Sequence, residues 1–178
     1  AVDAFPRLRF TSSADQVKAF QLQATGQPDQ AFHELVEKIV GSVFEGVAFI
    51  ELDAAGAIAS VIPQCRTEKL RLVAPVSLAQ PTQEWLFALL LATKEAVRRD
   101  IRCAAQATLA TASDDVEAAV DAIEGASIAQ AATVALRLQF TAVMEHTLSA
   151  LMAGDAHAFD AAVNVLHKRT DVMSQRLK

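Results

Sequence analysis

The chain has 178 residues, a formal net charge of −5 and a pI of about 5.3. This length allows one domain with a hydrophobic core, or one domain with an appendage. The negative charge argues against nucleic acid or an anionic membrane as a partner. The hydrophobic fraction of 52% contains many small alanine side chains, and no uncharged run in the first half approaches the length of a membrane span.

Residues that support chemistry are sparse. Cys65 and Cys103 have neither metal-binding nor redox spacing, and both lie in apolar or strand-like segments, so we expect reduced, partly buried thiols in a cytoplasmic protein. His157 and His167 lie on one predicted helix about 15 Å apart, too far to share a metal ion. The sequence has no glycine-rich phosphate loop and no nucleophile elbow. We therefore expect no enzymatic activity, no cofactor and no metal site.

The first part of the chain divides into an arm and a helix. Residues 1–27 are predicted to form an N-terminal arm, in which Ser12 or Ser13 caps a short helix. Pro28 marks a boundary and suits the first turn of a helix. From residue 31 to 44, apolar side chains recur every three or four positions, which predicts an amphipathic helix.

Three strands are predicted after this helix. Residues 47–53 and 57–62 are rich in aliphatic and β-branched side chains, and a short loop containing Gly56 joins them, which is typical of a hairpin. A third β-rich run covers residues 69–74, in which charged and apolar side chains alternate as far as Leu72. The sequence therefore predicts a three-strand antiparallel meander.

The next predicted helix runs from Pro81 to about Arg99. Its segment from Trp85 to Ala92 is apolar on all sides and requires burial on more than one side. We interpret this surplus as a subunit interface on one face, and the alternative is a two-layer core within one chain. The candidate dimer-interface residues are Trp85, Leu86 and Leu89.

Residues 101–124 fit two structures. Apolar and polar side chains alternate over 101–109 and again over 116–122, with turn residues at 113–115 between them, which favours a second hairpin. The high alanine content favours a helix instead. We predict the hairpin and keep the helix as the alternative.

The last third is predicted to form an αα-hairpin. Ser127 and Gln130 form a capping box at the start of a long helix that ends at Gly154. The predicted buried face of this helix carries Ile128, Val134, Leu138, Phe140, Val143, Met144, Leu148 and Leu151. A further helix follows, lined by Phe159, Val163, Leu166 and Met173. We predict one α+β domain over residues 28–153, with a C-terminal helical extension over residues 154–178.

The order of helix, three strands, apolar helix, predicted hairpin and long helix resembles the class I chaperones of bacterial type III secretion and related chaperone-like domains. Residues 32–44 and the following GVAFIELDAAG (46–56) look like the first helix and strands of that family. LRLVAPVSL (70–78), with LLLAT (89–93) beyond it, looks like the third strand and second helix. The resemblance covers residues 30–152. It implies a homodimer that holds an extended segment of a client protein over exposed strands.

Two other interpretations remain open. The helix and two strands at the start also resemble small sensory or scaffolding modules of the roadblock or PAS type, in which an apolar pocket or a dimer surface receives a partner. If residues 101–124 are helical, the chain is a mostly α-helical adaptor. We expect a non-enzymatic binding protein, with a protein or peptide client as partner and with neither nucleic acid nor membrane bound; the client-binding residues are unassigned.

Overall fold

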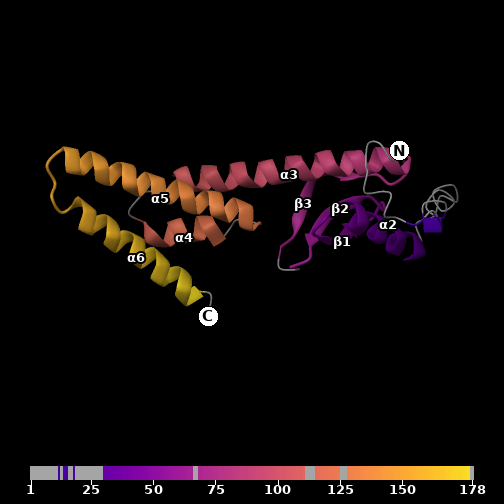
Figure 1. Cartoon of the computed structure of the whole chain (residues 1–178), viewed down its shortest axis with the longest axis horizontal. Helices are drawn as coiled ribbons and strands as arrows, with labels where there is room; N and C mark the ends of the chain where they lie inside the picture. The colour runs from indigo at the N-terminus through magenta and orange to yellow at the C-terminus, as the bar shows by residue number, and fades with distance from the viewer. Residues whose placement is uncertain are drawn as a thin grey trace. The chain divides into compact units, whose positions relative to one another are not determined.

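The computed structural model describes residues 12, 14, 15, 18, 30–65, 68–110, 115–124 and 128–176, and only the backbone of 116, 122, 124 and 176. Of the described residues, 68% are helical and 14% lie in strands, which confirms the predicted α+β fold. The chain forms two compact units, residues 1–97 and 98–178 (Figure 1). The division lies inside one long helix, so the predicted domain limits at residues 28 and 154 stay predictions.

The first unit combines a helix, a sheet and the beginning of a long helix. Its elements are α2 (Gln30–Val43), β1 (Val47–Leu52), β2 (Ile58–Pro63), β3 (Leu70–Val76) and the part of α3 (Thr82–Ala110) that precedes Arg98. The predicted amphipathic pattern of α2 is confirmed, because its buried side chains repeat every three or four residues: Phe32, Leu35, Val36, Ile39, Val40 and Val43. Gly46 follows α2 with a φ of +86°, a conformation that other residues rarely adopt.

The predicted meander is confirmed as an antiparallel sheet in the order β1-β2-β3. Asp53 shapes the turn between β1 and β2, since its Oδ1 accepts hydrogen bonds of 2.9 Å from the backbone N–H groups of Ala55 and Ala57. In β3, buried Leu70 and Leu72 alternate with exposed side chains. One face of this strand is therefore turned towards the core and the other towards solvent.

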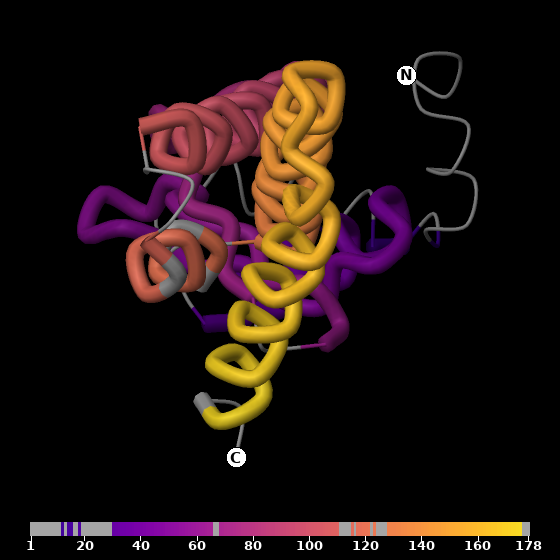
Figure 2. The backbone as a smooth tube through the Cα atoms, turned by 90° about the vertical axis from the view of Figure 1, so that its left-hand side faces the viewer, coloured from indigo at the N-terminus to yellow at the C-terminus, as the bar shows by residue number. Residues whose placement is uncertain are grey.

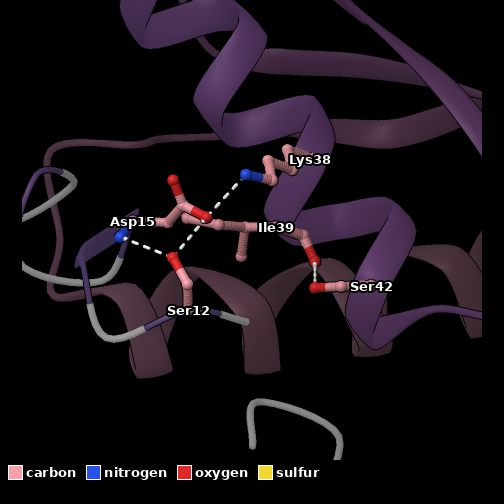
Figure 3. Close-up of polar contacts among 5 residues, drawn as sticks. All are labelled: Ser12, Asp15, Lys38, Ile39 and Ser42. Carbon is pink, nitrogen blue, oxygen red and sulfur yellow. Dashed lines mark hydrogen bonds and ion pairs between the residues drawn. The ribbon is translucent and has the colours of Figure 1, made fainter. Parts of the chain in front are cut away.

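An ion pair connects α2 with an earlier segment of the chain. The Lys38 ammonium lies 2.7 Å from Oδ2 of Asp15, and Ser12 Oγ accepts a 3.1 Å hydrogen bond from the Asp15 N–H (Figure 3). This second contact is the N-cap predicted for Ser12. The hydrogen bond that Lys38 donates to this carboxylate, followed by the 2.7 Å hydrogen bond that the Ser12 hydroxyl also donates to it, holds the pKa of the Asp15 carboxyl below its ordinary value. Most of the predicted arm lies outside the described residues.

The second unit is helical throughout the part that the structure describes. It contains the rest of α3, followed by α4 (Val116–Glu124), α5 (Ala129–Met152) and α6 (Ala158–Arg176). α4, α5 and α6 all contact one another, and Figure 2 shows α4 beside the α5–α6 pair. The last helix is therefore an integral part of this unit.

The predicted hairpin over residues 101–124 is wrong, because 101–110 continue α3 and 116–124 form α4. The alanines that weakened the strand pattern are good helix formers, and their propensity outweighs the alternation. The Thr108 hydroxyl donates to the Ala104 carbonyl one turn earlier at 2.8 Å. Asp115, predicted as a turn residue, caps α4 by accepting a 3.0 Å hydrogen bond from the Ala118 N–H.

The predicted αα-hairpin of α5 and α6 is confirmed. Gly154 has a φ of +95°, and the Asp155 N–H donates to the Ala150 carbonyl at 3.0 Å, as in a Schellman motif. The predicted capping box is not the start of α5. The helix begins after Ile128 with no side-chain cap, and Ser127 lies outside the described residues.

Candidate functional site

The three predicted interface residues lie in the core of the first unit. Trp85 is 1% exposed, Leu86 0% and Leu89 1%. The two-layer core that was the alternative explanation accounts for their burial, and the dimer stays a prediction. The same helix exposes Phe87 and Leu91 by about half of each side chain.

The largest apolar surplus lies on the α5–α6 hairpin instead. Of the eleven large hydrophobic side chains that are exposed among the described residues, seven belong to α5 and α6. These seven are Leu136, Phe140, Leu148, Leu151, Met152, Phe159 and Val163. Single exposed hydrophobic residues are ordinary on a protein surface, but a cluster on one motif is a feature of binding surfaces.

The buried side of α5 carries small or polar side chains. It consists of residues spaced by four, which we call the inner stripe: Ala131, Ala135, Gln139, Val143 and Thr147. Spacing by four places them along one side of a helix. Ala131 and Ala135 have no exposed surface, so they permit a close approach of neighbouring backbones. Gln139 Nε2 donates a 2.7 Å hydrogen bond to the Ala119 carbonyl of α4, which satisfies this buried amide.

Large apolar side chains of α5 lie beside this inner stripe. Each follows an inner-stripe residue by one position, about 100° around the helix, or continues the row at its end. We call this row the outer stripe: Leu136, Phe140, Met144, Leu148 and Leu151. Met144 is half-buried and the others are exposed, with Phe140 at 53%. α5 therefore buries its small side chains and displays its large ones.

α6 repeats this arrangement. Its buried residues include Ala158, Ala162 and Arg169. The neighbouring row, spaced by three and four, is called the α6 stripe: Phe159, Val163, Leu166, Thr170 and Met173. Phe159 is 55% exposed and Val163 36%, so the sequence identified this row correctly as one face but was wrong to predict its first half as buried.

The outer stripe and the α6 stripe meet in a groove of about 590 Å³. Leu136 and Phe140 line it from α5, and α4 contributes Ile123 from its last turn. α6 contributes Leu166, Arg169, Thr170 and Met173. The groove has the size of an ordinary ligand site, and it lies where the apolar stripes of two helices meet the last turn of a short third helix.

The charged residues of the groove are cationic. Its described lining includes Arg137 and Arg169 and no carboxylate, although the chain as a whole is acidic. Arg169 is only 7% exposed. Arg137 is exposed, and it makes no ion pair with any residue that the structure describes. An anionic group at the groove would therefore meet an unneutralised guanidinium.

Other candidate features of the sequence are not brought together. A second cavity of about 150 Å³ on the hairpin is lined by His146 and Asp155 among small side chains. Cys65 and Cys103 are exposed, are not joined in a disulfide and lie in different units, so the expected partial burial of both thiols is wrong. Over the described ranges, no three His, Cys, Asp or Glu side chains are placed to hold a metal ion.

The sequence contained a signal for this surface that our predictions did not use. Residues 131, 135, 139, 143 and 147 form a four-residue repeat of small or polar side chains with a single valine, and such a row suits close helix packing. We expected large apolar side chains to be buried, and Ile128 and Val143 are the only predicted ones that are fully buried. The groove itself depends on how α4 and α6 pack, which periodicity does not encode.

No protein-family model and no curated protein matches the chain. Among the described residues, no helix has both the length and the apolar character needed to cross a membrane. The geometry of the hairpin is therefore the basis for a functional interpretation.

Proposed function

We propose that the chain is a non-enzymatic protein-binding module in which the α5–α6 hairpin receives a helical segment of a partner protein. The observation that carries this proposal is the exposed row of large apolar side chains on α5 next to the groove. Two helices with parallel apolar stripes offer the surface into which the apolar face of an amphipathic helix packs.

The length of α4 supports this proposal. α4 has 9 residues, whereas α5 has 24 and α6 has 19. A helix rises about 1.5 Å per residue, so α4 covers less than half of the α5–α6 pair. The end of α4 lies at the start of α5, because only a few residues join the two helices and Ala119 of α4 lies beside Gln139 of α5. The uncovered part of the outer stripe, from Leu148 onward, therefore lies beyond the start of α4. A partner helix along the outer stripe would cover it and form a four-helix arrangement.

Affinity selection from a phage-displayed library of helical peptides on the full-length chain tests the proposal. We expect amphipathic peptides to be enriched on the wild type and to lose at least tenfold in affinity with Phe140→Ser, because burial of a phenylalanine contributes about 1.5–3 kcal/mol. Phe87→Ser is the matched control, since Phe87 on α3 has the same 53% exposure. Failure to enrich any peptide, or equal binding to Phe140→Ser, would contradict the proposed function.

A second candidate function is the chaperone activity that the resemblance implies, in which an extended client segment adds to the sheet. Of the element order behind that resemblance, the first helix and three strands are present, and helices replace the predicted second hairpin. Its support is the topology: within the described residues, β1 and β3 each pair on one side only, and Val73 on β3 is 55% exposed. An extended segment at either edge would form backbone hydrogen bonds. Enrichment of peptides that depend on Val73 and not on Phe140 would favour this candidate.

A further inference from the structure

We propose that the partner segment is an acidic amphipathic helix, which packs beside α4 in the groove and places a carboxylate against Arg137. This inference rests on the proposed function and specifies the chemistry of the partner. Its observations are the charge of the groove and the character of the helix that already packs beside it.

The positive charge of the groove favours a partner helix with negatively charged side chains. The described lining contains no carboxylate, and its Arg137 makes no ion pair with a described residue. Arg137 is exposed beside the outer stripe, so a charged group of a bound helix can reach it without being fully desolvated. A carboxylate there forms a favourable ion pair, whereas a lysine is repelled by Arg137.

α4 shows which kind of helix the α5–α6 pair already accommodates. Its sequence, VEAAVDAIE, combines buried Ala119, Val120 and Ile123 with the exposed acidic residues Glu117 and Asp121. α4 contacts both α5 and α6, and Ile123 in its last turn lines the groove. A partner helix of the same character would therefore extend an existing packing arrangement.

Three stapled helical peptides of about twenty residues, long enough to span the hairpin, test this inference. They share the same apolar positions and carry glutamate, glutamine or lysine at all polar positions. Binding to the full-length chain is measured by fluorescence anisotropy at low and high salt. We expect the glutamate peptide to bind about tenfold more tightly than the lysine peptide at low salt, with a smaller difference at high salt because ions screen exposed charges.

Arg137→Glu should weaken binding of the glutamate peptide about tenfold and strengthen binding of the lysine peptide. Arg137→Gln should weaken binding of the glutamate peptide about two- to fivefold. Lys168→Glu is the matched control. Lys168 is also exposed, lies on α6 about half a turn away from the α6 stripe, and changes the net charge equally. We expect it to alter the affinity less than twofold.

The possible results separate the two proposals. Equal affinities for the three peptides, all lost in Phe140→Ser, would refute the acidic partner and leave the proposed function in place. Equal weakening by Arg137→Glu and Lys168→Glu would also refute it. Binding of no peptide would refute the proposed function itself. A dimeric wild type that becomes monomeric in Phe140→Ser would assign the groove to a second copy and contradict the acidic partner.

Discussion

Glu51 on β1 forms an ion pair with Lys69, which precedes β3, although the two strands are separated by β2. Glu51 lies opposite Ser60 of β2, which in turn lies opposite Arg71 of β3. The hydrogen bond from Lys69 holds the pKa of the Glu51 carboxyl below its ordinary value, against a smaller opposing effect of desolvation. This row of polar residues therefore links all three strands on one face of the sheet.

The lowered pKa predicts how this ion pair contributes to stability as the pH changes. Its contribution is complete above the pKa of Glu51 in the unfolded chain and is lost as the pH falls through the lower pKa of the folded chain. Glu51→Gln should therefore lower the midpoint of urea unfolding by more at pH 7 than at about pH 3. Fluorescence of Trp85, the single tryptophan, reports this transition.

Glu34→Gln serves as the control for this titration. Glu34 is exposed on α2 and makes no ion pair with the residues that the structure describes, so its replacement should change the midpoint little at either pH. If Glu51→Gln shifted the midpoint equally at pH 7 and pH 3, the ion pair would not be the cause.

At the scale of elements, residues 101–110 show how far a pattern can mislead. Alternation of apolar and polar side chains is compatible with a helix when the apolar residues are mostly alanine, because alanine is tolerated on any face of a helix. α2 and the three strands were predicted correctly because their apolar residues are large and their spacing fits only one structure. The burial of α5 was predicted wrongly because large size was taken as a sign of burial.

Substitution of Gln106 distinguishes helix from strand directly. Gln106 is exposed in α3, so the intrinsic helix propensity of the new residue should determine how a substitution changes the free energy of unfolding. We expect Gln106→Val to lower the free energy of unfolding by about 0.5 kcal/mol relative to Gln106→Ala, as measured by chemical denaturation monitored by circular dichroism. A strand at this position would give the opposite order, because valine favours strands.

The exchange of small and large side chains on α5 predicts an unusual mutational pattern. Ala135→Leu should destabilise the second unit by about 1–3 kcal/mol, because Ala135 is fully buried and its surroundings have no room for a larger side chain. Phe140→Ser should change stability by less than about 0.5 kcal/mol, as expected for an exposed site. Thermal unfolding of both variants checks this order, and a greater loss for Phe140→Ser would show that the outer stripe is part of the core.

At the scale of the whole molecule, the division into two compact units predicts separate responses to core substitutions. Leu89 is 1% exposed in the first unit, and Leu89→Ala should cost about 2–5 kcal/mol. In hydrogen exchange measured by mass spectrometry, we expect Leu89→Ala to accelerate exchange in β1, β2 and β3 and not in α5 or α6. Ala135→Leu should have the reverse effect. Equal acceleration in both units would show that they unfold as one.

The division itself was not predictable from sequence, because no linker marks it: it falls between Val97 and Arg98, inside the continuous helix α3. Composition shifts and breaker residues identify boundaries only where the chain leaves regular structure. The candidate binding surface was equally hidden, since it arises from the packing of α4, α5 and α6. The sequence identified the helices of the hairpin but predicted as buried five large apolar side chains that the structure exposes: Phe140, Leu148, Leu151, Phe159 and Val163.

The two rows of α5 differ by a single position along the chain. Deleting one residue at the start of the helix would move Leu136, Phe140, Met144 and Leu148 into the places now held by Ala135, Gln139, Val143 and Thr147. If the sequence of this 24-residue helix were shifted by one position relative to its buried side, α5 would be an ordinary amphipathic helix with its large side chains buried. The exposure of large apolar side chains on α5 thus depends on their position around the helix and not on the amino-acid composition. Deleting one residue would bury these side chains and leave the composition almost unchanged.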